Sequence, residues 1–114
     1  MAKIAKITVT IEIDGAPVRG FPFSRRLSLD ETTSFSIDVA SGGFTDLPVA
    51  AIGTKQLFFL QPAGTTTFQF GNGAAGNLQV NSGGFLLGVD CTHATDIEAS
   101  PSSSTVIDAI IGGT

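Results

Sequence analysis

The sequence predicts an all-β protein: a single antiparallel β-sandwich or jelly-roll-like barrel of about 8–10 short strands. Apolar and polar side chains alternate with period two along most of the chain, and turn signals recur about every 8–12 residues. No stretch shows the period of an amphipathic helix. We expect one domain spanning residues 1–114, because this length is ordinary for a single hydrophobic core.

The first predicted strand runs through residues 7–13 (ITVTIEI), where every second side chain is isoleucine or valine. Asp14-Gly15 follows directly and predicts a tight hairpin turn. Pro17 and Pro22 cannot donate to a strand ladder, so the returning segment is expected to be an edge strand or irregular.

The same alternation continues in residues 35–39 (FSIDV), 67–70 (TFQF) and 78–81 (LQVN), and Asn72-Gly73 predicts a turn between the last two segments. The inward row of these strands and of the C-terminal run 105–111 predicts the core. Its members are Ile7, Val9, Ile11, Ile13, Phe35, Ile37, Val39, Phe68, Phe70, Leu78, Val80 and Ile107.

Charged residues make up only 14 % of the chain, where a soluble domain has about 25 %. The net charge is −4, and no basic cluster exceeds Arg25-Arg26, so no nucleic-acid partner is expected. The longest apolar runs, such as residues 57–60, are too short for a bilayer span or a signal-peptide core, so we expect neither feature and no membrane partner.

The candidates for chemistry are few. Cys91 and the single histidine, His93, are two residues apart and would share one face of a strand. They could form a nucleophile pair or part of a metal site, but the spacing implies no third group, and a structural role is favoured. We therefore expect no enzyme, no cofactor, and no catalytic, cofactor-binding or metal-binding residue.

Asp96 and Glu98 also project from one face of a predicted strand. A solvated strand face is the favoured interpretation, and a weak calcium site is the alternative.

A second function class is a free ligand-binding module of the carbohydrate-binding type, since many small β-sandwiches bind sugars. Sugar sites favour exposed Trp and Tyr, which combine an apolar ring face with a polar atom. This chain has neither, and its nine aromatic residues are all Phe. The carbohydrate-type module is therefore the alternative hypothesis.

The 34 residues from 56 to 89 contain no charged side chain and no histidine. Natural β proteins protect exposed sheet edges with charges, especially Lys, whereas the cores of interfaces are depleted of charge. We therefore expect this stretch to be covered by copies of the chain or by a larger assembly. The candidate assembly surface is its outward row: Thr65, Thr67, Gln69, Asn77, Gln79 and Asn81.

The second half of the chain resembles the small virion proteins of tailed bacteriophages, particularly capsid cement or decoration proteins. The resemblance lies in residues 65–70 (TTTFQF), 84–89 (GFLLGV), 95–99 (TDIEA) and 105–113 (TVIDAIIGG). It implies a jelly-roll or related fold and a non-enzymatic homo-oligomer, with a trimer favoured. It further implies that the protein is made in the host cytoplasm and lies on the virion, where a major capsid protein is its partner. It carries no motif and so implies no site residue.

Overall fold

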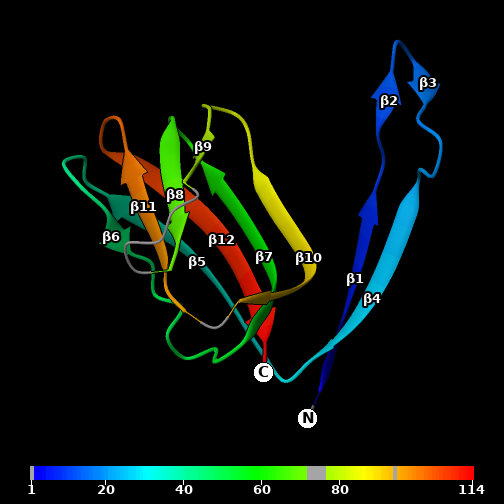
Figure 1. Cartoon of the computed structure of the whole chain (residues 1–114), viewed down its shortest axis with the longest axis horizontal. Coiled ribbons are helices and arrows are strands. Elements are labelled where there is room, and N and C mark those ends of the chain that lie inside the picture. Colours follow the sequence, from blue (N-terminus) through cyan, green and yellow to red (C-terminus); the bar gives the residue numbers. More distant parts are fainter. Residues whose placement is uncertain (1, 72–76, 94) are drawn as a thin grey trace.

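The computed structural model describes residues 2–71, 77–93 and 95–114, and every regular element within these ranges is a β-strand (Figure 1). The described ranges contain no helix with the length and apolar character needed to cross a bilayer. In chain order the strands are β1 (Lys3–Val9), β2 (Glu12–Ile13), β3 (Ala16–Pro17), β4 (Phe23–Leu29), β5 (Glu31–Val39), β6 (Thr45–Asp46), β7 (Lys55–Pro62), β8 (Thr66–Phe70), β9 (Leu78–Val80), β10 (Leu86–His93), β11 (Ile97–Pro101) and β12 (Thr105–Gly113).

Eight of these strands form two four-stranded antiparallel sheets that pack against each other (Figure 1). Sheet I has the order β10-β7-β12-β5, and sheet II has the order β6-β11-β8-β9. The all-β class and the antiparallel sandwich predicted from the sequence are confirmed. The main core lies between the sheets and contains Val39, Leu47, Val49, Ile52, Leu60, Phe68, Val80, Ile97, Ala99, Ile107, Ala109 and Ile111.

β12 lies at the centre of sheet I, paired with β5 on one side and β7 on the other. Its inward row is buried in the core, while Val106, Asp108 and Ile110 alternate with that row and are exposed on the outer face of the sheet. Gly113 ends the strand against the Thr54 carbonyl, where a side chain would overlap the backbone. The strand end is fixed there, because the N–H groups of Thr54 and Thr114 each donate to the other residue's carbonyl at 3.0 Å.

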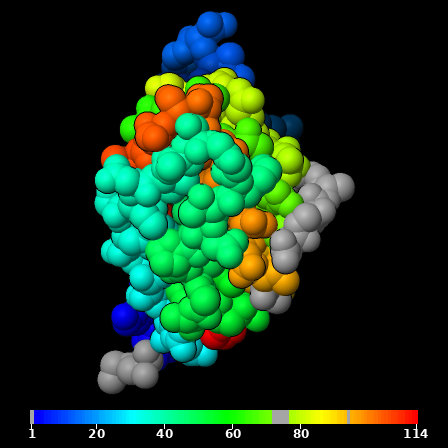
Figure 2. All heavy atoms as spheres, turned by 90° about the vertical axis from the view of Figure 1, so that its left-hand side faces the viewer, coloured from blue at the N-terminus to red at the C-terminus, as the bar shows by residue number. Residues whose placement is uncertain are grey.

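Residues 3–29 form a two-stranded arm that stands beside the sandwich (Figure 1). β1 and β4 form its shaft, and β2 and β3 form its tip. Asp14 and Gly15 have φ angles of 53° and 78°, the left-handed pair that a tight hairpin turn requires, so the predicted turn is confirmed. The tip extends beyond the sandwich in Figure 1, and it stands out in blue at the top of Figure 2.

The base of the arm packs on the outer face of sheet I. Leu27 and Leu29 of β4 are buried against Leu57 of β7, and these three residues form a second, smaller core. Ala5 and Ile7 of β1 pack partly against the same cluster. One face of the arm therefore contacts the sandwich near the base.

The predicted core is right for every predicted sandwich residue except Leu78, and in the arm it holds only in part, since Ile7 packs against the second core. Val39, Phe68, Val80 and Ile107 are buried, and Phe35, Ile37 and Phe70 are partly buried against them. Ile7 and Val9 belong to the arm and are only partly buried.

The prediction is wrong for three residues, which are exposed rather than buried in the core. Ile13 lies at the arm tip and is 64 % exposed, and Ile11 before it stays exposed although it lines a hollow with Leu87 and Val89 of β10. Leu78 begins β9, a three-residue strand at the edge of sheet II, where no further strand covers it. The predicted turn at Asn72-Gly73 lies outside the described residues.

Candidate assembly surfaces

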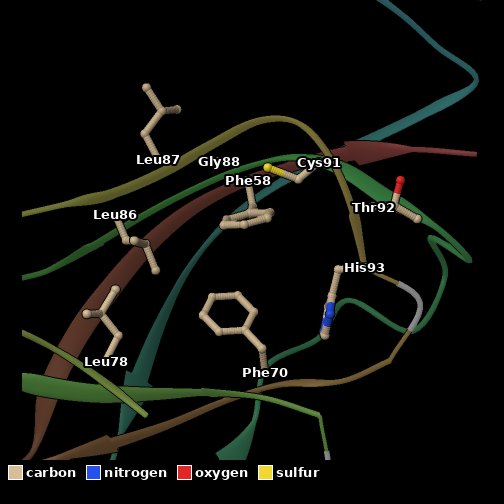
Figure 3. Close-up of a pocket in the computed structure, with 9 residues that line it drawn as sticks. All are labelled: Phe58, Phe70, Leu78, Leu86, Leu87, Gly88, Cys91, Thr92 and His93. Carbon is tan, nitrogen blue, oxygen red and sulfur yellow. The ribbon is translucent and has the colours of Figure 1, made fainter. Parts of the chain in front are cut away.

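An apolar pocket of about 340 Å³ lies between β10 and sheet II (Figure 3). Cys91 and His93 lie at one end of it together with Thr92, in the part of β10 where the pairing with β7 is irregular. The His93 ring packs edge-on against Phe70, with ring centroids 5.4 Å apart. The lining residues are Phe58, Phe70, Leu78, Leu86, Leu87, Gly88, Cys91, Thr92 and His93.

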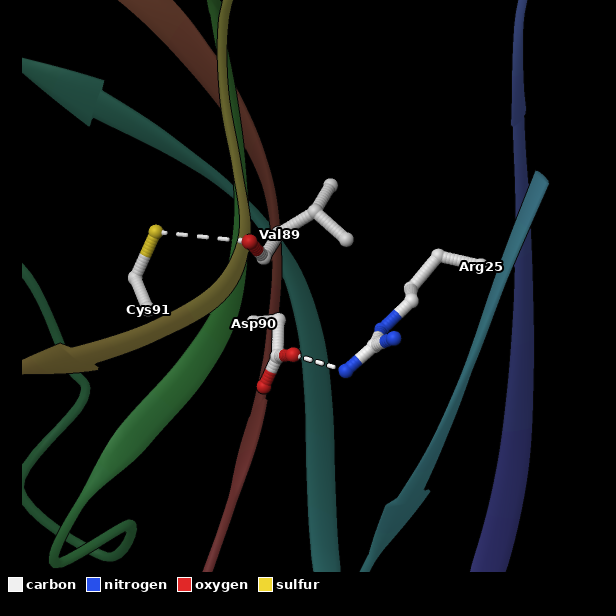
Figure 4. Close-up of polar contacts among 4 residues, drawn as sticks. All are labelled: Arg25, Val89, Asp90 and Cys91. Carbon is white, nitrogen blue, oxygen red and sulfur yellow. Dashed lines mark hydrogen bonds and ion pairs between the residues drawn. The ribbon is translucent and has the colours of Figure 1, made fainter. Parts of the chain in front are cut away.

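The polar atoms of Cys91 and His93 are engaged by the backbone rather than by each other. The Cys91 thiol donates to the Val89 carbonyl at 3.6 Å (Figure 4), and His93 Nε2 lies 3.0 Å from the Asp96 carbonyl oxygen. No hydrogen bond joins the thiol to the imidazole within the described residues.

Glu98 of β11 lies opposite Asp46 of β6, and its Oε1 atom is buried without a hydrogen-bond partner in the described structure. Partial burial, with Asp46 and Asp96 nearby, raises the pKa of Glu98 above its ordinary value of 4.5. Among the described residues, no three His, Cys, Asp or Glu side chains are grouped to hold a metal ion. The calcium alternative for Asp96 and Glu98 thus finds no ligand set there.

The structure brings together part of the row that the sequence proposes as an assembly surface. Thr67 of β8 lies directly opposite Gln79 of β9, and the Thr65 hydroxyl accepts a hydrogen bond from the Ser82 N–H at 3.3 Å. Both threonines are partly buried. They therefore lie side by side with the β9 segment at one edge of sheet II.

The other members of the row differ in exposure. Asn77, Gln79 and Asn81 are exposed, and the Gln79 amide donates to the Asn81 side-chain oxygen at 3.1 Å. Gln69 is only 7 % exposed and lies opposite Glu98 in the ladder, so it offers little surface to a partner.

A different surface, which sequence reasoning missed, lies on the outer face of sheet I. Val106 and Ile110 of β12 and the neighbouring Phe85 are exposed large apolar side chains. The Phe85 ring packs on Phe59, with centroids 5.5 Å apart. A hollow of about 400 Å³ lies between β5, β12 and β7 on this face, lined in part by Ile110 and Asp108.

Two carboxylates share this outer face. Asp108 is opposite Ser36 in the ladder, and Asp38 is opposite Val106, which makes the two aspartates diagonal neighbours on one side of the sheet. Both are exposed. We call the set Asp38, Phe59, Phe85, Val106, Asp108 and Ile110 the outer patch.

The arm and the sandwich carry opposite charge. The arm holds five of the six basic residues and two of the ten acidic ones, a net +3, whereas residues 30–114 hold one basic and eight acidic residues, a net −7. That one basic residue, Lys55, is only 3 % exposed. In the described structure, exposed basic charge therefore belongs to the arm alone.

One ion pair already joins the two parts. Arg25 of β4 reaches across to the Asp90 carboxylate of β10 (Figure 4), and it is the single ion pair among the described residues. Both side chains are about half exposed. On the opposite face of the arm, Lys6 and Arg26 lie directly across the ladder from each other.

No family model, no curated protein and no solved structure matches this chain.

Proposed function

We propose that the protein is a non-enzymatic structural component that assembles with copies of itself and binds the surface of a larger particle. A tailed-phage capsid is the particle that the resemblance of residues 65–113 favours, and its major capsid protein is then the partner. The observation that carries the proposal is the arm, whose tip extends past the sandwich (Figures 1 and 2) and which exposes apolar side chains such as Ile13 and Phe23.

A two-stranded hairpin is at best marginally stable by itself in water. Ile13 at the tip is exposed, and so are Ile11 and Phe23 nearer the shaft, which line a hollow that Leu87 and Val89 of β10 close only in part. Each of these side chains gains free energy when a partner removes it from water, at about 25 cal/mol per Å² of apolar area. A protein partner supplies that cover, whereas a small ligand is too small to cover a strand pair.

The charge distribution supports the same proposal. The uncharged edge formed by β8 and β9 lacks the lysines that normally prevent strand edges from associating. The apolar pocket beside Cys91 and His93, in contrast, has few polar groups with which to orient a sugar. The described geometry therefore favours assembly over the carbohydrate-binding alternative.

The test is the mass in solution of the wild type and of an arm-tip variant, Ile11→Thr/Ile13→Thr. Threonine keeps the β-branched shape but removes apolar area, so the hairpin should persist. The wild type should have a mass that is a multiple of 11.7 kDa, and the variant should dissociate at least about tenfold more readily.

Phe44→Ser is the matched control, because Phe44 is an exposed apolar residue before β6, outside the arm. It should associate as the wild type does. Co-sedimentation with capsids tests the second half of the proposal. A wild type that stays at 11.7 kDa at all concentrations and binds no particle would refute it.

A further inference from the structure

The face of the arm that points away from the sandwich has a defined composition. Ala5 and Ile7 pack toward sheet I, so the alternate residues Ile4, Lys6 and Thr8 form the opposite, exposed row of β1. Their partners across the ladder are Ser28, Arg26 and Ser24. The Thr8 and Ser24 hydroxyls lie 3.2 Å apart, which places them on one side of the arm.

Two cations directly opposite each other destabilise an isolated strand pair. Lys6 and Arg26 are such a pair, and neither has an ion-pair partner among the described residues. An acidic surface placed over this face would offset the repulsion between them, because each cation would then be attracted to a carboxylate.

The outer patch of sheet I is a surface of that kind. Its β12 row reads Val106, Asp108, Ile110, with Asp38 as a second carboxylate beside it. The arm row reads Ile4, Lys6, Thr8, with Arg26 as a second cation beside it. Successive members of either row are two positions apart, about 6.6–6.8 Å along the strand. Lys6 and its apolar neighbour Ile4 therefore have the same spacing as Asp108 and its apolar neighbours.

The sandwich already binds one face of its own arm with the same chemistry. Arg25 pairs with Asp90, and Leu27 packs on Leu57, at the end of sheet I nearest the base of the arm. The outer patch lies on the same side of the sheet, and its Phe59 and Ile110 line a hollow beside β1 of the same copy, which Lys6 and Thr8 also border.

We propose that the exposed face of the arm, centred on Lys6 and Arg26, binds the outer patch of a second copy, with Asp38 and Asp108 as the counter-charges. This inference rests on the proposed self-assembly and names the two surfaces that carry it. The opposite net charges of the arm and the sandwich select a second copy as the occupant, because each copy carries both halves of the contact.

The experiment uses two charge-reversed full-length variants, Lys6→Glu/Arg26→Glu and Asp38→Lys/Asp108→Lys. All four side chains are exposed, so both variants should fold. Each variant alone places like charges in the contact and should raise the dissociation constant by at least about tenfold. Mixed in equal amounts, they should form a heteromeric complex, because each then supplies the charge that the other has lost.

Arg19→Glu is the control, since it reverses a basic charge of the arm outside the β1–β4 ladder, and it should associate as the wild type does. Circular dichroism checks that every variant keeps its strands. If the wild type associates and both reversed variants associate equally well, the arm-to-patch contact is wrong while self-assembly stands. If the wild type is monomeric, both proposals fail. If the mixture shows no recovery, the two surfaces do not meet each other.

Discussion

Arg25 of β4 and Asp90 of β10 form an ion pair that ties the arm to the edge of sheet I (Figure 4). Asp90 has a φ of 57°, a left-handed conformation that aspartate and asparagine tolerate better than most residues. The backbone thus bends where the carboxylate meets the arm, within the irregular pairing of β10 with β7 between Val89 and His93.

Asp90→Asn removes the charge but keeps the shape and the tolerance for positive φ. Global stability should change by less than about 1 kcal/mol, because both partners are half exposed. Backbone amides of β1 and β4 should exchange faster with solvent at low protein concentration, whereas those of β12 should not change. Asp96→Asn, outside this contact, is the control. Unchanged exchange in the arm would mean that the buried leucines at its base hold it alone.

Because of Glu98, the stability of the fold should depend on pH. Its pKa is raised in the folded protein, so the folded state holds the proton more tightly than the unfolded state does. Its contribution is most favourable below the ordinary value of 4.5 and is lost as the pH rises through the raised folded pKa. Glu98→Gln should therefore raise Tm at pH 7 and flatten the dependence of Tm on pH above 4.5.

The matched control is Glu12→Gln, the same chemical change at the exposed arm tip, which should leave the pH profile as it is. Thermal unfolding followed by circular dichroism between pH 4 and pH 8 measures both variants. A Glu98→Gln variant that is less stable than the wild type at pH 7 would contradict the assignment.

Phe68 anchors the centre of the sandwich. Its side chain is 0 % exposed, so Phe68→Ala should lower the free energy of unfolding by about 3–5 kcal/mol. Phe44→Ala makes the same truncation at a site that is 40 % exposed and should cost clearly less, about 1–2 kcal/mol. Urea unfolding compares the two. Equal losses would show that the packing between sheets I and II is not as described.

The uncharged β8–β9 edge is a second surface at which a substitution should weaken association. Gln79→Lys puts a charge on the exposed row that faces away from the core of sheet II, so the fold should persist. If this edge is covered in the assembly, the lysine should weaken oligomerisation or particle binding, because an unpaired charge is costly to bury. Ser41→Lys, on an exposed loop before β6, is the control. Full association of Gln79→Lys and Thr67→Lys would show that this edge is not covered in the assembly.

The sequence predicted the sandwich because its strands face a core on one side, which period-two alternation reports directly in residues 35–39 and 105–111. The same alternation in residues 7–13 led to a wrong core prediction. Alternation shows that one face of a strand is apolar, but it does not show whether another part of the protein covers that face. Asp14-Gly15 located the hairpin, yet nothing local in the sequence indicates that this hairpin leaves the body of the fold.

The outer patch was harder to predict from the sequence. Asp38 and Asp108 are 70 positions apart and become neighbours only through the β5–β12 register. One signal was present: five of the six basic residues lie between Lys3 and Arg26, which separates the charges of the arm from those of the remaining chain. The Asp14-Gly15 turn lies between these basic residues, so together they indicate a two-stranded element with a positive charge.

We propose that the arm is the element through which copies associate. Hydrogen exchange of the backbone amides, measured at low and at high protein concentration, tests this proposal. Amides of β1 to β4 should exchange more slowly as the concentration rises, because association shields the arm, while buried amides of β12 should keep their rates. Arm amides that exchange at the same rate at every concentration, in a protein that nonetheless associates, would contradict it.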